Sequence, residues 1–199
     1  AERVALVPTM GALHAGHISL VTAVKKHVES AVASIFVNPT QFAPNEDFSK
    51  YPRTFENDLK LLSEVGAEAV FAPGVTDMYP PGFTTTVTLE GPAKVGLEDA
   101  FRPTHFDGVA TVVSKLLLQG LPDVAIFGEK DFQQLAVIRR ATRDLDIPVE
   151  IMGGATVREK DGLAMSSRNV YLSPEERALA PIIHRTLTKV AADIRAGLL

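Results

Sequence analysis

Short runs rich in Val, Ile and Phe alternate along this chain with longer segments of helical periodicity. The strand-like runs cover residues 4–7, 31–37, 70–71, 124–127 and 149–152. The helical patterns cover residues 18–27, 55–64, 109–118 and 132–145. This alternation is typical of parallel β-α-β units, because each helix carries the chain back to start the next strand in the same direction. We therefore predict an α/β fold: a doubly wound, Rossmann-like parallel sheet with helices on both faces.

Two segments need separate treatment. Thr54 precedes the helical pattern at 55–64 and can cap it, and the expected apolar stripe of that helix consists of Phe55, Leu59 and Leu62. Residues 84–89 (TTTVTL) alternate like a strand, although Pro- and Gly-rich segments flank them. We count this segment as an additional predicted strand.

The composition limits the classes of function. The chain has 199 residues, 46% of them hydrophobic, which is enough to bury a substantial core. A formal net charge of −4 argues against nucleic acid as a partner. The chain has no cysteine, which excludes disulfides, thiolate metal sites and cysteine nucleophiles and fits a cytoplasmic location. Apolar stretches such as residues 109–118 are far too short to span a bilayer, so we expect no membrane partner and small-molecule substrates instead.

Polar side chains gather in three segments that directly follow predicted strands. These segments are PTMGALHAGH (8–17), NPTQF (38–42) and GEKDFQQ (128–134). In doubly wound sheets, ligands bind beyond the carboxyl ends of the strands, where the strand order reverses. We therefore expect the three segments to meet at one site.

The first segment does not match the known phosphate-binding loops. Gly11 and Gly16 have the spacing of a P-loop, but His17 and Ile18 replace its Lys and Ser or Thr. The fingerprint G-x-G-x-x-G is also absent, which argues against a nicotinamide cofactor. What remains is a helix start with His14 and His17 on one face. Because the helix dipole favours anions and disfavours a protonated imidazole there, we predict two neutral hydrogen-bond donors for phosphate oxygens.

Five motifs in order carry a family resemblance. The segment PTMGALHAGH is similar to the first signature of the HIGH-type nucleotidyltransferases. Together with four further motifs it closely resembles the pantoate-β-alanine ligase (pantothenate synthetase) family, over residues 3 to 172. The further motifs are FVNPTQF (36–42), RPTHFDGV (102–109), FGEKDFQQL (127–135) and MSSRN (165–169).

The resemblance implies an enzyme that condenses pantoate with β-alanine in two half-reactions. Pantoate and ATP give pantoyl adenylate and pyrophosphate, and β-alanine then displaces AMP to give pantothenate. A carboxylate nucleophile is already ionised at pH 7, so the first step needs alignment and neutralisation of the leaving group rather than a base. Mg²⁺ is expected to accompany the ATP, with no protein ligand assigned. The matching catalytic positions are His14, His17, Lys130, Ser166, Ser167 and Arg168.

The resemblance also implies the substrate contacts. For pantoate, the polar positions are Gln41 and Gln134, and an apolar wall is expected from Met10, Phe36, Val112 and Val113. The ATP-binding positions are Thr9, Met10, Gly16, His17, Gly128, Lys130, Asp131, Val157, Ser166, Ser167 and Arg168, with Asp131 as the ribose partner. For β-alanine the prediction is Asn38 and Arg102.

Simpler interpretations stay open for the individual residues. His14 and His17 can be a hydrogen-bonded helix start, or two ligands of a metal site with His105. Lys130 can be a surface lysine beside Asp131, and the glutamines and serines can belong to ordinary turns. For the whole chain, the alternatives are another HIGH-type nucleotidyltransferase and a non-catalytic ligand-binding fragment.

The C-terminal part predicts a second unit. We assign residues 1–156 to the nucleotide- and pantoate-binding domain, and residues 157–199 to the MSSR loop and first helix of an incomplete C-terminal lid domain. Ser173 followed by Pro174 and Glu176 predicts a capped helix that runs toward Ala196 with a kink at Pro181.

The resemblance implies that the family's lid domain is truncated in this chain. Because a closed lid excludes water from the adenylate, we expect ligand binding with weak or no turnover. A homodimer is the assembly that the resemblance implies.

Overall fold

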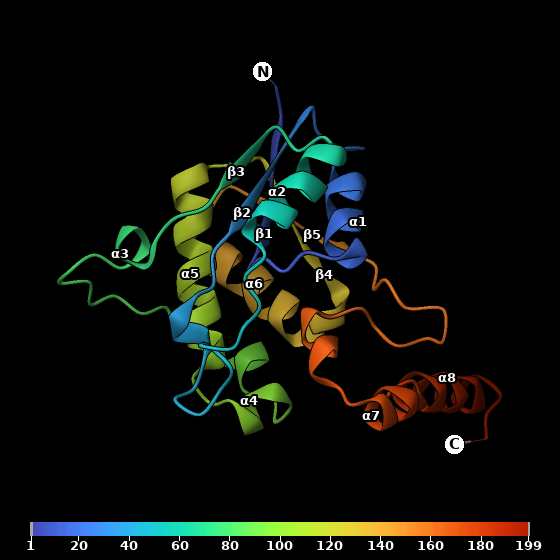
Figure 1. Cartoon of the computed structure of the whole chain (residues 1–199). Helices are drawn as coiled ribbons and strands as arrows, with labels where there is room; N and C mark the ends of the chain where they lie inside the picture. The colour runs from blue at the N-terminus through green and yellow to red at the C-terminus, as the bar shows by residue number, and fades with distance from the viewer. Residues whose placement is uncertain (1, 199) are drawn as a thin grey trace.

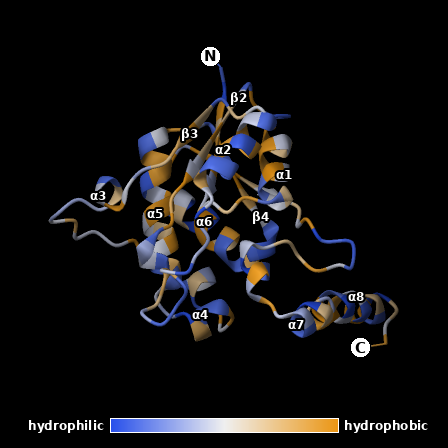
Figure 2. Cartoon of the chain, in the orientation of Figure 1, coloured by the Kyte–Doolittle hydropathy of each residue, from blue (hydrophilic) through white to orange (hydrophobic). Residues whose placement is uncertain are grey.

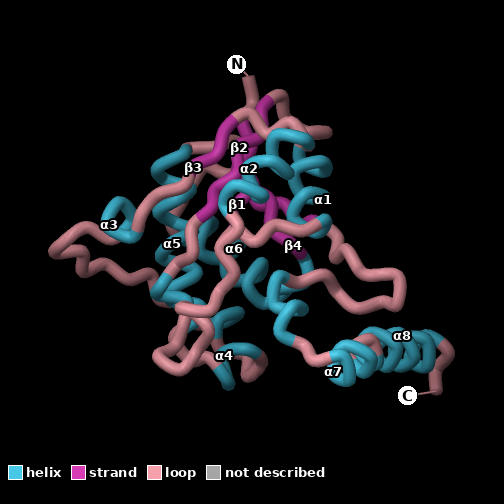
Figure 3. The backbone as a smooth tube through the Cα atoms, in the orientation of Figure 1, coloured by secondary structure: helices cyan, strands magenta, loops and turns pink. Residues whose placement is uncertain are grey.

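The computed structural model describes residues 2–198 and has one parallel sheet at its centre (Figures 1 and 3). Its strands are β1 (Val4–Thr9), β2 (Ser30–Ile35), β3 (Ala69–Phe71), β4 (Val124–Gly128) and β5 (Glu150–Gly154). The strand order is β3-β2-β1-β4-β5, and every neighbouring pair is parallel. This order confirms the predicted doubly wound sheet, since the chain proceeds outward from the centre in both directions.

Helices cover both faces of the sheet, as predicted. The α-helices are α1 (Ala15–Val24), α2 (Phe55–Glu64), α3 (Val75–Met78), α4 (Glu98–Phe101), α5 (His105–Gly120), α6 (Phe132–Asp144), α7 (Pro174–Leu179) and α8 (Ile182–Arg195). Four short 3₁₀ segments are η1 (Pro39–Gln41), η2 (Gly91–Ala93), η3 (Glu129–Asp131) and η4 (Ser167–Tyr171).

Each face of the sheet has its own hydrophobic core. On one face α1 and α2 pack against the strands through buried residues that include Val21, Val24 and Leu62. On the other face α5 and α6 do so through residues that include Leu117 and Ile138. Figure 2 shows the strands and the sheet-facing sides of these helices as the apolar interior. Burial on both faces explains why the strands read as continuous apolar runs rather than alternating ones.

Two helix starts differ from the sequence prediction. Helix α1 begins at Ala15 rather than Ile18, because the side chain of His14 accepts from the backbone N–H of Gly16 and caps it. Helix α5 begins at His105 rather than Val109. Polar residues therefore belong to the first turn of both helices, where apolar periodicity does not detect them.

Helix α2 has the predicted bounds but a different buried face. Phe55 is 44% exposed, whereas Asp58 is only 1% exposed and Leu62 is buried as predicted. Thr54 makes no side-chain hydrogen bond to the helix backbone, and its hydroxyl donates to the carboxylate of Asp58 instead (3.0 Å). A charged residue thus lies on the buried face of the helix, for which the sequence pattern predicted only apolar side chains.

The predicted strand at 84–89 is wrong. The segment is irregular and pairs with no strand of the described sheet. Its alternation arises because Val87 and Leu89 pack against the core that α5 covers, while Thr88 between them is exposed. The N–H of Val87 donates to the hydroxyl of Thr111 on α5 (2.9 Å), so a helix takes the place of a neighbouring strand.

The C-terminal helix start is confirmed. Ser173 and Glu176 form the predicted capping box, each side chain accepting from the other's backbone N–H. The predicted kink at Pro181 is a complete break, since α7 ends before Pro181 and α8 begins after it. In Figure 1, α7 and α8 lie beside the body, away from the sheet.

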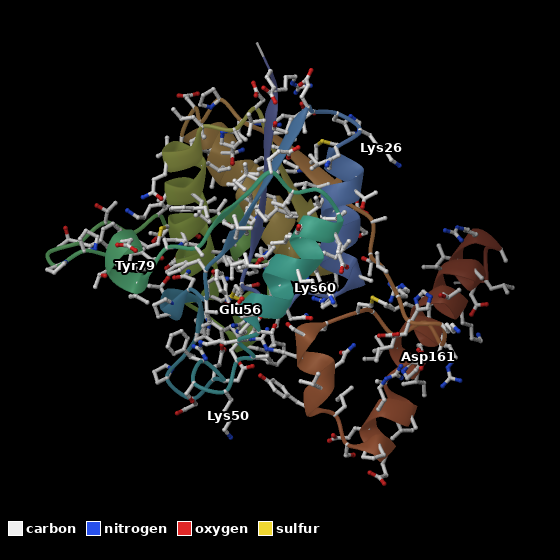
Figure 4. The ribbon with its side chains drawn as sticks, turned by 45° about the horizontal axis from the view of Figure 1, so that its top comes forward. Lys26, Lys50, Glu56, Lys60, Tyr79 and Asp161 are labelled. Carbon is white, nitrogen blue, oxygen red and sulfur yellow. The ribbon has the colours of Figure 1, made fainter. Side chains whose placement is uncertain are left out.

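An ion pair joins α7 to the segment that follows β5. The guanidinium of Arg177 contacts the carboxylate of Asp161 (2.6 Å), which Figure 4 labels beside the C-terminal helices. No helix in the described part of the chain is long and apolar enough to cross a membrane.

A close backbone contact determines where η1 lies. A Cβ atom on Gly108 of α5 would lie 2.4 Å from the carbonyl oxygen of Thr40 in η1. The side-chain amide of Asn38 also donates to the carbonyl of Gly108 (3.2 Å). Helix α5 and η1 can approach this closely only because residue 108 lacks a side chain.

We predict that Gly108→Ala lowers the free energy of unfolding by about 1–3 kcal/mol, as overpacking does in cores. Gly120→Ala is the matched control, because a Cβ there would make only ordinary contact with Pro122, at 3.8 Å. The control should be neutral or slightly stabilising, since alanine favours the helix over glycine. Urea unfolding of the three proteins measures the difference, and equal midpoints for the two variants would contradict the packing argument.

Candidate active site

A pocket lies beyond the carboxyl ends of β1 and β4, where the strand order reverses. The three polar segments that follow β1, β2 and β4 all contribute to its lining, as expected from the sequence, together with residues 155–157 and 165–168. Every residue predicted for a substrate or a catalytic role lines this pocket except Asn38. They are Thr9, Met10, His14, Gly16, His17, Phe36, Gln41, Arg102, Val112, Val113, Gly128, Lys130, Asp131, Gln134, Val157, Ser166, Ser167 and Arg168.

The two histidines form a reciprocal cap at the start of α1. His14 is the residue that precedes the helix, and its Nδ1 accepts from the backbone N–H of Gly16 (3.1 Å). The backbone N–H of His14 in turn donates to Nδ1 of His17 (3.3 Å). The ring centroids are 4.1 Å apart. The two histidines can therefore cap the helix and also bind a ligand, since the cap uses only their Nδ1 atoms.

The cap determines the protonation state of both rings. Because each Nδ1 accepts a backbone hydrogen, the proton of each neutral imidazole is on Nε2. Burial and the nearby Lys130 lower the pKa of His14. Burial, His14 and Lys130 lower the pKa of His17 to about 3, with Asp131 opposing them. Both rings are thus neutral donors near pH 7, which agrees with the prediction from the helix dipole.

Lys130 and Asp131 stand opposite the histidines on η3. The ammonium of Lys130 lies 2.9 Å and 3.0 Å from the two carboxylate oxygens of Asp131. The side chain of Lys130 is 37% exposed, so this neighbouring pair is solvated and easily rearranged. Because Lys130 also lowers the pKa of both imidazoles, its ammonium is near them, and this solvated side chain can turn toward an anion.

Asn38 lies beneath the pocket and orients Gln41. It is 1% exposed, and its amide donates to Oε1 of Gln41 (2.9 Å). Its own oxygen accepts from Thr40 and from the hydroxyl of Tyr79 (2.8 Å). With Oε1 of Gln41 occupied, the amide N–H groups of Gln41 are the ones directed to a ligand. All polar side-chain atoms of Asn38 already have protein partners, so contact with β-alanine would require one of these hydrogen bonds to break.

Arg102 lines the pocket but is engaged by two carboxylates. Its guanidinium forms a bidentate pair with Glu46, with both distances 2.7 Å, and contacts Glu98 at 2.8 Å. It also donates to the backbone carbonyl of Gln41 (2.9 Å). Arg102 holds the pKa of the Glu46 carboxyl below its usual value. Contact of Arg102 with a substrate carboxylate therefore requires one of these partners to move.

Arg168 is paired in the same way with the adjacent residue, Asp47. Two nitrogens of its guanidinium lie 3.0 Å from the two oxygens of Asp47, and the cation stacks over the ring of Tyr51. Arg168 lowers the pKa of the Asp47 carboxyl through these bonds. The hydroxyl of Tyr51 also contacts that of Ser167 (3.1 Å). The segment 42–51 is thereby fastened to the MSSRN segment.

The three-histidine metal site has no support from the geometry. Between Glu2 and Leu198 there is no group of three His, Cys, Asp or Glu side chains arranged to hold a metal ion. His105 is buried and contacts the carbonyl of Gln41 through Nδ1 (3.0 Å), so that nitrogen carries its proton. His105 thus fastens η1 to α5 and takes no part in the cap that His14 and His17 form.

Sequence reasoning missed the residues that support the site. Asp47, Tyr51 and Asp58 were missed because their stretch of chain does not directly follow a strand and contains none of the five family motifs. Their acidic or aromatic character alone is typical of any surface loop. A signal that could have found Asp58 is an acidic residue at a helix position where periodicity requires an apolar one.

The chain matches a family model, Pantoate-beta-alanine ligase, over residues 1–197. A protein of Paramagnetospirillum magneticum named pantothenate synthetase is 64% identical over 194 residues, covering 98% of this chain and 68% of that protein. A pantothenate synthetase of Rhodospirillum rubrum is 59% identical over 195 residues, covering 98% of this chain and 69% of that protein. These identities extend over almost the whole chain and not only over the five motifs.

Solved structures agree with the sequence comparisons. Pantothenate synthetase from Thermus thermophilus superposes with a TM-score of 0.96 at 55% identity, covering 98% of this chain and 71% of that one. Pantoate-beta-alanine ligase from Francisella tularensis, complexed with beta-gamma ATP and beta-alanine, gives a TM-score of 0.88 at 39% identity, covering 94% and 72%. The family resemblance of the motifs is thus confirmed, and this chain belongs to the pantoate-beta-alanine ligase family.

Proposed function

We propose that this chain joins pantoate to β-alanine at the expense of ATP, through a pantoyl adenylate. The observation that carries the proposal is the pocket at the switch point, which gathers the predicted ATP and pantoate residues from segments far apart in the sequence. A family member from Francisella tularensis was solved with beta-gamma ATP and beta-alanine, which supports the use of both compounds.

The first step joins a carboxylate oxygen of pantoate to the α-phosphorus of ATP. The bond from that phosphorus to the bridging oxygen breaks, and pyrophosphate leaves with the electron pair. The nucleophile is already an anion, so no base is needed, and charge on the leaving group must be stabilised. His14, His17 and Lys130 supply two neutral donors and one cation for this purpose, and Ser166 and Ser167 add hydroxyl donors from the opposite wall.

Neutral imidazoles suit this role better than protonated ones. A cation at each position would bind the ground-state triphosphate strongly and would also be costly to bury at the start of a helix. Neutral Nε2–H donors gain most where charge develops in the transition state. The lowered pKa values of His14 and His17 support this assignment.

Pantoate fits the part of the pocket that combines amides with an apolar wall. Gln41, oriented by Asn38, and Gln134 on α6 offer hydrogen bonds to the carboxylate and hydroxyl. Amides hold the nucleophile without forming an ion pair that would blunt its attack. The wall for the two methyl groups consists of Met10, Phe36, Val112 and Val113.

The adenosine and the metal ion complete the ATP site. Gly128, Asp131 and Val157 line the end of the pocket that we assign to adenosine, with Asp131 as the ribose partner. Because the described residues offer no cluster of metal-ligating side chains, we assign no protein residue to Mg²⁺. The ion would be carried by the phosphate oxygens, as Mg²⁺ commonly is, and would neutralise part of their charge.

In the second step the amine of β-alanine attacks the acyl carbon of the adenylate. The carbon–nitrogen bond forms, the bond from the acyl carbon to the phosphate oxygen breaks, AMP leaves with the electron pair, and the amine releases its proton to water. Arg102 is the proposed partner of the β-alanine carboxylate, which would exchange for Glu46 or Glu98. Asn38 contributes by holding Gln41. Arg168 pairs with Asp47 through Nε and Nη2, so its Nη1 can donate to a phosphate while that pair is kept.

The domain boundary and the assembly are parts of the same proposal. We retain a boundary near residue 156, supported by the end of the sheet at β5 and by a short antiparallel bridge between Arg158 and Ala164 that follows it. The homodimer stays an expectation from the family resemblance. A cytoplasmic location stays a prediction from the sequence.

We predict that, in pantoate-dependent ATP–pyrophosphate exchange, Gln134→Leu impairs pantoate binding and His17→Ala impairs the chemical step. Loss of the Gln134 hydrogen bond should raise the pantoate KM about tenfold or more, with ATP binding unchanged. Loss of the His17 donor should lower kcat about a hundredfold. His27→Gln, at an exposed position outside the pocket, is the control.

Calorimetric titration of the parent and each variant with pantoate, with and without ATP, gives the dissociation constants that should follow these kinetic changes. ATP–pyrophosphate exchange that does not depend on pantoate would contradict the proposed reaction. Equal effects of Gln134→Leu on both substrates would refute the assignment of this residue.

We predict that His17 makes the protein more acid-sensitive. Its pKa is lowered to about 3 from a reference value of 6.5, so between these values the unfolded chain binds more protons than the folded one. The free energy of unfolding contributed by His17 is thus complete above pH 6.5 and is lost as the pH falls toward 3. Thermal unfolding of His17→Gln should depend less steeply on pH between 6.5 and 4 than that of the parent. Identical slopes would mean that His17 is protonated as easily in the folded protein as in a peptide.

A further inference from the structure

The buried carboxylate of Asp58 lies outside the pocket lining, yet it is bonded to the segment that carries the histidines. Asp58 lies in the first turn of α2 and is 1% exposed. Its oxygens accept from the backbone N–H groups of Ala12 (2.9 Å) and Leu13 (2.8 Å) and from the hydroxyl of Thr54 (3.0 Å). It takes part in none of the ion pairs formed within residues 2–198. Backbone amides, not a cation, therefore satisfy this carboxylate.

The amides that Asp58 binds belong to a turn that is unfavourable by itself. Gly11 has a φ of +78° and Ala12 a φ of +50°, so two successive residues adopt the left-handed region. Only glycine does so readily, and for alanine this conformation requires compensation from its surroundings. A Cβ on Gly11 would lie 3.0 Å from Oδ2 of Asp58, which shows how closely the carboxylate fits into the turn.

The turn leads directly into the histidine cap. Leu13, whose N–H is bound by Asp58, is followed by His14, whose N–H is bound by Nδ1 of His17. The path from the carboxylate to the second imidazole thus consists of consecutive residues and two hydrogen bonds. Leu13 is itself buried in the core between α1 and α2, so the turn has no freedom to adjust on that side.

We propose that Asp58 is a positioning residue for this site: its carboxylate fixes the turn at residues 11–13 and thereby holds the imidazoles of His14 and His17 toward the triphosphate. This inference rests on the function proposed above. It assigns Asp58 no contact with substrate. It predicts an effect on the ATP part of the pocket and not on the pantoate part, because the hydrogen bonds of Asp58 go to Ala12, Leu13 and Thr54 and not to Gln41 or Gln134.

The test is Asp58→Asn, which keeps the size of the side chain and removes one acceptor. The single amide oxygen can serve one of the two backbone N–H groups, and the amide NH₂ would face the other. The matched control is Glu56→Gln, the same chemical change in the same helix turn at an exposed position labelled in Figure 4. Thr54→Val, which removes the third hydrogen bond and leaves both amide contacts, is the milder variant.

Two measurements separate positioning from general destabilisation. The first is an NMR titration of the His17 imidazole, which reports the cap directly. The groups facing the two rings are Lys130 and Asp131 from η3 and Glu159 from the segment after β5, and all remain in these variants. The second is the comparison of kcat/KM for ATP with the dissociation constant for pantoate.

For Asp58→Asn we expect His17 to titrate at a higher pH than in the parent, and kcat/KM for ATP to fall about ten- to a hundredfold, since small misplacements of catalytic groups have large effects. Pantoate affinity should change less than about threefold, because additivity holds for residues without shared partners. Thr54→Val should show the same pattern more weakly, and Glu56→Gln should match the parent.

A folded Asp58→Asn protein with unchanged His17 titration and unchanged kcat/KM for ATP would overturn the proposal. If Asp58→Asn does not fold, Thr54→Val with a parental His17 titration and parental kinetics would overturn it as well. The proposed function fails separately: a parent that binds neither pantoate nor ATP, but whose His17 titration still responds to Asp58→Asn, would refute the reaction and retain the positioning role.

Discussion

Strands β1 and β4 lie side by side at the centre of the sheet, and the chain leaves them toward opposite faces and opposite edges. Their carboxyl ends therefore open a crevice that no crossover helix can cover, which is the general position of ligand sites in such sheets. The ends of these two strands supply the first residues of the pocket, from Pro8 to Met10 and from Phe127 to Gly128. The other walls are formed by segments fastened to this crevice, so the site exists because of the strand order rather than because of any single loop.

Short polar contacts between segments, rather than a continuous core, shape the walls of that crevice. Asn38 holds Gln41 from below, and Asp58 holds the turn that precedes His14. Both side chains are almost completely buried, and in both cases nearly all polar atoms have partners, which is the condition under which buried polar groups rigidify a structure. A pocket of this kind is preorganised: the ligand meets donors whose orientation has been determined during folding.

The sequence predicted the sheet, its flanking helices and the pocket lining because each of these leaves a local signal. Apolar runs gave the strands, and polar segments after strands gave the site. The signal misled at residues 84–89, where alternation reflects packing of Val87 and Leu89 on a helix instead of strand pairing. The family motifs predict Asn38 and Arg102 as site residues, but their hydrogen bonds to Gln41 and Glu46 depend on tertiary contacts that no sequence period reveals. Asp58 escaped for the same reason, since its buried carboxylate is explained only by amides 45 and 46 positions away.

Glu46 and Asp47 are adjacent in the chain, yet their side chains neutralise arginines from different walls of the pocket, Arg102 and Arg168. An anion that displaces either carboxylate exchanges one ion pair for another, so entry of a charged ligand brings little net electrostatic gain. Discrimination between ligands then comes from shape and hydrogen bonding. Because one peptide unit links the two acids, a single stretch of backbone presents both carboxylates to the pocket. Residues 46–47 thus connect the pocket wall that carries Arg102 to the wall that carries Arg168.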